Sequence, residues 1–193
     1  MIIGITGASG SGKSIASKCF EEIGYKIVDL DKITHEIYKT DKECVNEVKS
    51  AFGDLVIDEN GDIIRKKLGE IVFCDKEKLN ILNKIVHKYI LKKALEEIKS
   101  SSDVIVDAPL LFESGLDEVC DITLGIVSDR EENAKRIKER DNISFDLAKA
   151  RLDKQYDDSF FKEKCSFFIE NNGTMEEFLK QIDLFIKNEV TKK

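Results

Sequence analysis

The sequence predicts an α/β fold in which a parallel sheet is flanked by helices. Along its 193 residues, short apolar runs of strand length alternate with longer stretches of helical period. This alternation is typical of a parallel sheet that is covered on both faces. Hydrophobic residues make up 41% of the chain and charged residues 36%, which suits one buried core beneath a charged surface.

Five apolar runs are expected to form the strands of this sheet. They are short, as strands buried in a parallel sheet usually are. In chain order they are Ile2–Thr6, Lys26–Val28, Val104–Val106, Ile122–Val127 and Phe167–Ile169.

The helices between these strands are recognised by their periodicity and their end signals. Lys13–Ile23 has helical period and is followed by Gly24, a residue that often ends helices. Apolar residues recur along one face from Leu79 to Ile98, which predicts a long helix. Thr174 and Glu177 have the spacing of a capping box and predict the start of a last helix. Its inward residues are expected to be Phe178, Ile182 and Phe185.

The spacing of the strands predicts one domain over residues 1–193 that carries two additions. Residues 32–102 separate the second and third strands and are mostly helical, so we expect an inserted helical subdomain that binds substrate. A second, polar helical stretch at about 130–165 is expected to form a lid. Insertions at the carboxyl edge of such sheets are where substrate domains and lids usually lie.

Composition narrows the possible partners. A net charge of −7 argues against nucleic acid as the main partner, because phosphate contacts need a basic stripe. No apolar run approaches the roughly 20 residues that span a bilayer, and the N-terminus lacks the pattern of a signal peptide. The five cysteines are scattered and are expected to be reduced. We therefore expect a cytoplasmic protein, with no membrane association and no obligate protein partner evident.

Residues 7–14, Gly-Ala-Ser-Gly-Ser-Gly-Lys-Ser, match the phosphate-binding loop, or P-loop, without a mismatch. The glycines allow the backbone to approach phosphate oxygens, and the N-terminus of the following helix adds an anion site. Lys13 is expected to neutralise the β- and γ-phosphates of ATP, and the Ser14 hydroxyl to hold Mg²⁺, partly through water. The fold is therefore expected to be of the P-loop NTPase type. The expected nucleotide contacts are Gly7, Ala8, Ser9, Gly10, Ser11, Gly12, Lys13, Ser14 and Ile15.

A P-loop alone does not identify the reaction. The guanine-reading pattern Asn-Lys-x-Asp of GTPases is not met at Asn83-Lys84, which lacks the aspartate. The third strand is followed by Asp107, which could reach Mg²⁺ through water or could form a turn before Pro109. Both readings stay open.

Two aspartates follow the second strand in the run Asp29-Leu30-Asp31. A kinase must orient an acceptor hydroxyl and accept its proton, and a carboxylate at the sheet edge can do both. The alternative is that an aspartate here caps the helix that starts near Lys32. Of the two, Asp31 is the stronger catalytic candidate.

Arg136 and Arg140 lie four residues apart and share one face of a helix in the expected lid. Such a pair could hold the charge of a transferring phosphoryl group. The neighbouring acids, among them Glu139 and Asp141, also allow solvated salt bridges on a surface helix.

Taken together, these residues resemble the dephospho-CoA kinases, and the resemblance covers nearly the whole chain. The P-loop and Asp29-Leu30-Asp31 fit the family, and Pro109–Glu113 matches its Pro-Leu-Leu-Phe-Glu signature in full. The remaining matches are Gly61, Arg65, Leu68 and Phe73; Leu82, Asn83 and His87; Arg136, Arg140, Arg151 and Gln155; and Asn171, Asn172 and Gly173. One departure is Lys88, which stands where the family typically has proline and makes a continuous helix easier to form.

The resemblance implies transfer of the γ-phosphoryl group of ATP to the ribose 3′-hydroxyl of dephospho-CoA, with Mg²⁺ as the metal. It implies that Asp31 is the base, and that Lys13 and Arg140 stabilise charge during transfer. Arg136, Asn172 and Gly173 would contact the nucleotide, the last two beside the adenine. Further substrate contacts would come from Arg65, His87 and Leu111.

Two other functions stay open at this point. One is a different nucleotide or small-molecule kinase on the same scaffold, because no pattern identifies the acceptor from first principles. The other is a nucleotide-dependent regulatory switch, which would hydrolyse ATP slowly without an acceptor.

Overall fold

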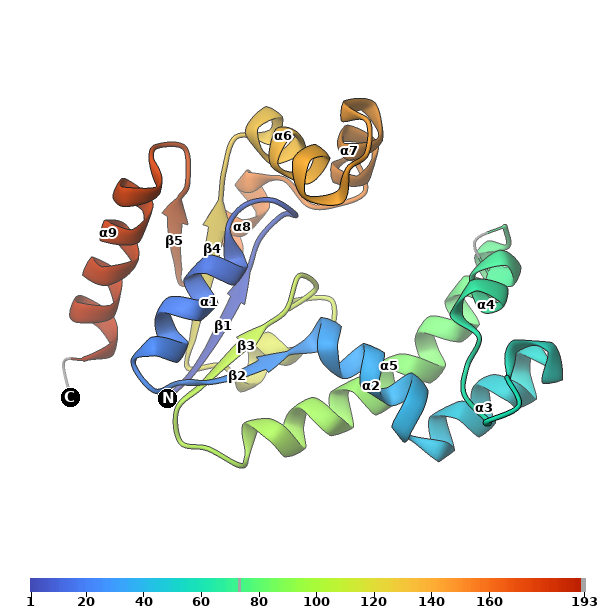
Figure 1. Ribbon diagram of the computed structural model, residues 1–193. Coiled ribbons are helices and arrows are strands. Elements are labelled where there is room, and N and C mark those ends of the chain that lie inside the picture. The colour runs from blue at the N-terminus through green and yellow to red at the C-terminus, as the bar shows by residue number, and fades with distance from the viewer. Residues whose placement is uncertain (73, 192–193) are drawn as a thin grey trace. The chain divides into compact units, whose positions relative to one another are not determined.

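The computed structural model describes residues 1–72 and 74–191, so the family match at Phe73 lies outside the described residues (Figure 1). Five strands and a set of helices alternate along the chain, as predicted. The strands are β1 (Ile2–Thr6), β2 (Lys26–Asp29), β3 (Val104–Asp107), β4 (Ile122–Val127) and β5 (Phe167–Glu170). The α-helices are α1 (Lys13–Glu22), α2 (Leu30–Thr40), α3 (Lys42–Phe52), α4 (Arg65–Val72), α5 (Lys76–Ile98), α6 (Arg130–Asp141), α7 (Phe145–Leu152), α8 (Asp158–Lys164) and α9 (Met175–Phe185).

The strands form one sheet in the order β2-β3-β1-β4-β5. β1 pairs in parallel with β3 on one side and with β4 on the other, and β4 pairs in parallel with β5. Because β1 lies in the middle and leads directly into the glycine-rich loop, that loop stands at the centre of the sheet's carboxyl edge. The predicted P-loop NTPase-type α/β fold is confirmed.

One face of the sheet is covered by α1 and α9. Ile3 and Ile5 of β1 point to this face and are fully buried in a cluster with Phe20 of α1. From α9, Phe178 and Ile182 enter the same cluster. The predicted capping box opens α9, since Thr174 accepts from the backbone N–H of Glu177 and the Glu177 side chain bonds back. The capping box therefore fixes where α9 begins, directly after the segment that follows β5.

The opposite face of the sheet approaches its cover closely at two glycines. A Cβ on Gly4 would lie 2.7 Å from a methyl of Leu111, and one on Gly125 would lie 3.1 Å from the sulfur of Cys165. Burial raises the pKa of Cys165 to about 12, and the same cause acts first on Cys120, also to about 12. Both thiols therefore stay protonated at neutral pH. All five cysteines are free.

The chain divides into two compact units. The first, here called the sheet unit, comprises Met1–Ile27 and Ser101–Lys193, and the second, the helical unit, comprises Val28–Ser100. In the helical unit, α5 packs against α2, α3 and α4. Its buried face includes Leu82, Ile85 and Val86, three residues of the predicted apolar stripe.

α5 runs without interruption through Lys88, the residue that stands in place of the family's proline. The Lys88 ammonium lies 2.5 Å from a carboxylate oxygen of Glu47 on α3, and it also lies over the Tyr89 ring. The Tyr89 hydroxyl donates to the same carboxylate at 2.8 Å. These bonds lower the pKa of Glu47, the bond from Lys88 most. Lys88 thus joins α5 to α3.

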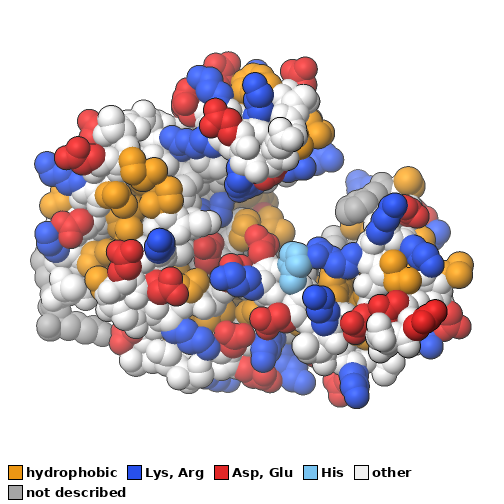
Figure 2. Space-filling view, in the orientation of Figure 1, with side chains coloured by type: hydrophobic (Ala, Val, Ile, Leu, Met, Phe, Trp, Pro, Cys, Tyr) orange, Lys and Arg blue, Asp and Glu red, His pale blue; other side chains and the backbone are white. Residues whose placement is uncertain are grey.

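Within residues 1–72 and 74–191, no helix has the length and the apolar character needed to cross a membrane. Figure 2 shows Lys and Arg side chains interspersed with Asp and Glu over the face in view. This mixture agrees with a chain in which 36% of residues are charged.

Candidate active site

The P-loop joins β1 to α1 and depends on glycine where its backbone turns most sharply. Gly7 has φ 144° and Gly12 has φ 112°, both in the region that favours glycine. A Cβ on Gly7 would lie 2.2 Å from the carbonyl oxygen of Ile126, and one on Gly12 would lie 2.6 Å from the Asn171 amide nitrogen. Both positions therefore exclude a side chain.

Lys13 is the first residue of α1, and its side chain folds back over the loop. Its ammonium donates to the carbonyl oxygen of Gly7 at 2.8 Å and to that of Ala8 at 3.0 Å. The charge therefore stands over the start of the loop. Ser14 follows in the first turn of α1 and is exposed, whereas the Ser11 hydroxyl is buried and has no hydrogen-bond partner among the described residues.

Three side chains from later in the chain hold the outer side of the P-loop. Gln155 accepts from the Ser9 backbone N–H at 2.8 Å and donates to the Ser9 hydroxyl at 2.9 Å. Arg136 donates to the Gly10 carbonyl at 3.2 Å, and Asn171 donates to the Ser11 carbonyl at 2.7 Å. Polar groups of Ser9, Gly10 and Ser11 are thus bonded by side chains from three separate segments of the chain. These bonds fix the conformation of the loop.

Arg136 also links the P-loop to the segment after β5. Its guanidinium donates to the Asn171 carbonyl at 3.0 Å and to the Ser128 hydroxyl at 3.1 Å. The neighbouring Asn172 accepts from the backbone N–H of Asp129 at 2.7 Å. Gly173 is exposed just before α9. The structure thus brings Arg136 and Asn171 to the P-loop, and Asn172 and Gly173 follow directly in the chain.

Arg140, the other arginine of the expected lid, has a different partner. It donates to both carboxylate oxygens of Asp141, at 2.7 and 3.1 Å, and Arg151 donates to the same carboxylate at 2.6 Å. The bond from Arg140 is the largest cause that lowers the pKa of Asp141. In this structure Arg140 is therefore engaged in a surface ion pair, one of the two alternatives that the sequence left open.

The aspartate at the end of β3 has a structural partner. Asp107 accepts from the Ser17 hydroxyl at 2.8 Å, and Ser17 is buried on α1. This bond ties α1 to β3 beside the P-loop. Across the described residues, no group of three or more His, Cys, Asp or Glu side chains could hold a metal ion. Magnesium at nucleotide sites is usually held by one or two protein groups together with phosphates and water, and the exposed Ser14 hydroxyl fits such a role.

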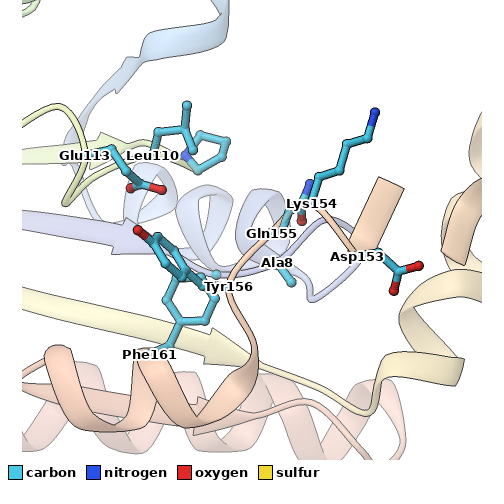
Figure 3. Close-up of a pocket in the computed structure, with 10 residues that line it drawn as sticks. Ala8, Leu110, Glu113, Asp153, Lys154, Gln155, Tyr156 and Phe161 are labelled. Atoms are coloured by element: carbon cyan, nitrogen blue, oxygen red, sulfur yellow. The ribbon is translucent and has the colours of Figure 1, made fainter. Parts of the chain in front are cut away.

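A pocket of about 360 Å³ opens beside the start of the P-loop, within the sheet unit (Figure 3). Gly7 and Ala8 form part of its wall, and the remainder comes from two segments of the chain. The first segment follows β3, and the second connects α7 to α8 and enters α8. The lining residues from these segments are Pro109, Leu110, Glu113, Asp153, Lys154, Gln155, Tyr156 and Phe161.

The Pro-Leu-Leu-Phe-Glu run faces this pocket through Leu110 and not through Leu111. Leu111 is fully buried and packs on Gly4, so its side chain belongs to the core. Leu110 is 51% exposed and lines the pocket. Leu111 was expected to contact substrate, whereas in this structure its neighbour Leu110 is the leucine that lines the pocket.

The helical unit holds the remaining predicted site residues. Asp29 is the residue that caps α2, because its carboxylate accepts from the Lys32 backbone N–H at 3.0 Å. Asp31 stands exposed in the first turn of α2 and does not cap the helix. The structure thus assigns the capping role, which the sequence left open, to the other aspartate.

Arg65 and His87 have different surroundings within the helical unit. Arg65 lies over the Tyr38 ring at 5.9 Å, and both line a pocket of about 480 Å³ with Lys66, Leu79 and Asn83 among the other lining residues. His87 is partly buried on α5 and is not among the lining residues of that pocket.

Comparison with known proteins identifies the family. A model of the dephospho-CoA kinase family matches residues 1–177. The chain belongs to the dephospho-CoA kinase family. A dephospho-CoA kinase of Fusobacterium nucleatum is 44% identical over 187 residues, which cover 96% of each chain. A solved dephospho-CoA kinase from Campylobacter jejuni is 32% identical with a TM-score of 0.74, covering 96% of this chain and 95% of that one. A solved Thermus thermophilus protein is 29% identical with a TM-score of 0.81, covering 97% and 96%.

Two side-chain contacts of this dephospho-CoA kinase family member could not be assigned a role from its sequence. Gln155 was recognisable only as part of a motif, and its contact with Ser9 spans 146 positions. Asn171 is 5% exposed and holds the P-loop, whereas the sequence pointed to Asn172 and Gly173 beside it. The only signal in the sequence was that both residues match the family motif. A polar residue that matches a motif usually has a hydrogen-bond partner, but the motif does not say which.

Proposed function

We propose that this chain transfers the γ-phosphoryl group of ATP to the 3′-hydroxyl of the ribose of dephospho-CoA, which gives coenzyme A and ADP. The observation that supports this most strongly is membership of the dephospho-CoA kinase family over residues 1–177. The P-loop, with its glycines and Lys13 in a geometry suited to phosphate, supplies the donor half of such a reaction.

On the donor side, the backbone N–H groups of residues 7–15 would hold the triphosphate at the N-terminus of α1. Lys13 would leave the carbonyls of Gly7 and Ala8 and pair with the β- and γ-phosphates. Ser14 would hold Mg²⁺, partly through water, and the bound ion would neutralise phosphate charge. Asn172 and Gly173 would lie beside the adenine of ATP. Arg136 would keep the P-loop and this adenine segment together.

On the acceptor side, Asp31 would orient the 3′-hydroxyl and accept its proton. Its carboxylate is exposed, and the capping of α2 is already done by Asp29. Arg65 and His87 would contribute further contacts to the acceptor from the helical unit. Leu110 takes the contact first expected of Leu111, because Leu111 is fully buried.

Arg140 would stabilise charge on the transferring phosphoryl group. Since it is paired with Asp141 in this structure, that role requires the pair to open when ATP is bound. The Arg140 side chain is 62% exposed, and ion pairs of exposed side chains contribute little stability. Asp141 is 24% exposed but keeps its bond from Arg151 when Arg140 leaves, so exchange of Arg140 from this carboxylate to a phosphate costs little.

The helical insert at about 32–102 would bind the acceptor and the segment at about 130–165 would act as the lid. We place the enzyme in the cytoplasm, which agrees with five free thiols.

The proposed function is tested by measuring Mg²⁺-dependent release of ADP from ATP under three conditions. They are dephospho-CoA as acceptor, a panel of other hydroxyl acceptors, and no acceptor. We expect strong stimulation by dephospho-CoA. Stimulation by another acceptor alone would favour a different small-molecule kinase, and turnover without any acceptor would favour a regulatory switch.

A further inference from the structure

The pocket beside Gly7 and Ala8 lies away from the segment that would bind the adenine of ATP. The segment Asn171–Gly173, which would contact the donor's adenine, follows β5 at one edge of the sheet. The segment from Pro109 to Glu113 follows β3, on the other side of the central strand β1. The pocket is therefore on the side of the P-loop opposite to the donor base.

The same pocket adjoins the phosphoryl group that is transferred. The Lys13 ammonium lies on the carbonyls of Gly7 and Ala8, which are also pocket-lining residues. In P-loop enzymes this lysine pairs with the β- and γ-phosphates. A molecule bound in the pocket is thus next to the γ-phosphate, as an acceptor must be.

The pocket offers a fixed apolar and aromatic surface. Tyr156 stacks on Phe160 with ring centroids 3.7 Å apart, and Phe160 packs edge-to-face against Phe112 and Phe161. Tyr156 is nevertheless 46% exposed, and Leu110, also a lining residue, is 51% exposed. Flat apolar groups held in place by neighbours can bind an aromatic ring at little entropic cost.

The charges around the pocket disfavour a diphosphate and favour a hydrogen-bond donor. Three charged residues line it, of which Glu113 and Asp153 are acidic and Lys154 is basic. Asp153 is paired with Arg130 at 2.7 Å, whereas Glu113 has no ion pair within the part of the chain that the structure describes. Figure 3 shows Glu113 and Leu110 on one side of the pocket and Gln155 and Lys154 on the other.

We propose that this pocket binds the adenine base of the acceptor, dephospho-CoA, with Glu113 accepting a hydrogen bond from the 6-amino group. The base would lie against Leu110 and Tyr156. Its ribose would then extend toward Gly7 and Ala8 and the γ-phosphate. The proposal rests on the function proposed above, and it adds which part of the acceptor binds here and which residue selects it. A volume of about 360 Å³ is within the range of small-molecule pockets.

Glu113 should make the enzyme selective among purines. Adenine presents an amino donor at position 6, whereas hypoxanthine and guanine present an oxygen acceptor there. If the Glu113 carboxylate faces that oxygen, two hydrogen-bond acceptors meet and neither has a donor. Sites that bind a donor group reject analogues without the donor for this reason. Glutamine at position 113 could both accept and donate, so it should tolerate either base.

The test compares dephospho-CoA with its hypoxanthine analogue, in which the 6-amino group is replaced by oxygen. For the unmodified enzyme we expect kcat/KM to favour the adenine acceptor by about tenfold or more. For Glu113→Gln we expect this ratio to fall to within about threefold. Glu118→Gln is the matched control, because Glu118 is an exposed acid in the same unit that does not line the pocket.

A second pair of variants tests the apolar wall. Leu110→Ala should raise the KM for dephospho-CoA about tenfold, equivalent to about 1.4 kcal/mol, and leave the KM for ATP unchanged, because apolar contact is removed from one substrate only. Leu184→Ala is the control, since Leu184 is 49% exposed on α9 and does not line the pocket.

An unchanged adenine preference in Glu113→Gln, together with an unchanged KM for dephospho-CoA in Leu110→Ala, would overturn the pocket assignment. Phosphorylation of dephospho-CoA by the unmodified enzyme would still stand in that case. If the unmodified enzyme phosphorylates neither acceptor, the proposed function itself fails, and the assignment of the pocket fails with it.

Discussion

Gln155 and Ser9, 146 positions apart in the chain, are joined by two hydrogen bonds. The Ser9 backbone N–H donates to the Gln155 side chain at 2.8 Å, and the Gln155 amide donates to the Ser9 hydroxyl at 2.9 Å. Ser9 lies in the P-loop, and Gln155 lies in the connection between α7 and α8. The conformation of the phosphate loop therefore depends on a segment of the expected lid.

We expect Gln155→Ala to weaken ATP binding about 30-fold. Two hydrogen bonds contribute about 1 kcal/mol each, and their loss lets the loop sample shapes that do not bind phosphate. Calorimetric titration with ATP in the absence of acceptor measures this directly. Gln181→Ala is the control, because Gln181 also donates a 2.9 Å bond, to the Glu170 carbonyl, at a site away from the P-loop. Equal ATP affinities in both variants would contradict the role given to Gln155.

Gly12→Ala should abolish measurable ATP binding at concentrations that saturate the unmodified protein. The added Cβ would lie 2.6 Å from the Asn171 amide nitrogen, so the bond from Asn171 to the Ser11 carbonyl would have to break. Gly24→Ala separates this clash from backbone strain. Gly24 has φ 100° and no atom within 4 Å of its added Cβ, so that variant should lose about 1–2 kcal/mol of stability and bind ATP normally. Denaturant unfolding and ATP titration of both proteins are the measurements.

Asp31→Asn should lower kcat by about 10²- to 10⁴-fold with little change in the Kd for ATP, because proton acceptance is lost while the charge on the donor side is unaffected. Asp29→Asn is a matched control, since asparagine caps helices about as well as aspartate and the bond to the Lys32 N–H can remain. Steady-state turnover and ATP titration of the two variants distinguish the roles. Full turnover in Asp31→Asn would remove Asp31 from the catalytic residues.

Lys88→Pro should lower the melting temperature by roughly 5–10 °C, because proline in the middle of α5 removes a helix hydrogen bond and clashes with the preceding turn. The ion pair with Glu47 would be lost as well. Lys88→Met keeps the helix but loses the charge and should shift the melting temperature by less than about 2 °C, since exposed ion pairs contribute little. Thermal unfolding of both variants is the check, and equal shifts would mean that the ion pair matters more than the helix.

The fold was largely predictable from the sequence because its strands are buried and its helix ends are marked. All five predicted strands form, and β2, β3 and β5 extend one residue further than predicted. The extra residues are Asp29, Asp107 and Glu170, which are polar and so do not register in an apolar run. The first helix ends at Glu22, and the predicted last residue, Ile23, caps it.

The site was less predictable, because long-range side-chain contacts leave no trace in local patterns. The P-loop is local, and its glycines and Lys13 could be recognised at once. Two details depend on the direction of the backbone at single residues. The sequence left open which aspartate caps α2. The family resemblance favoured Leu111 for substrate contact, whereas Leu110 is the leucine that lines the pocket. One partner of Arg136 is the Gly10 carbonyl, 126 positions away, and no helix pattern reveals such a contact.

We propose that the P-loop site transfers the γ-phosphoryl group of ATP to one hydroxyl of dephospho-CoA. The most direct test is to incubate the purified protein with ATP, Mg²⁺ and dephospho-CoA, and to measure ADP released and the position of the new phosphate by ³¹P NMR. We predict one coenzyme A formed per ADP, with the phosphate on the ribose 3′-oxygen. ADP release without a phosphorylated acceptor, or a phosphate at any other position, would contradict the account.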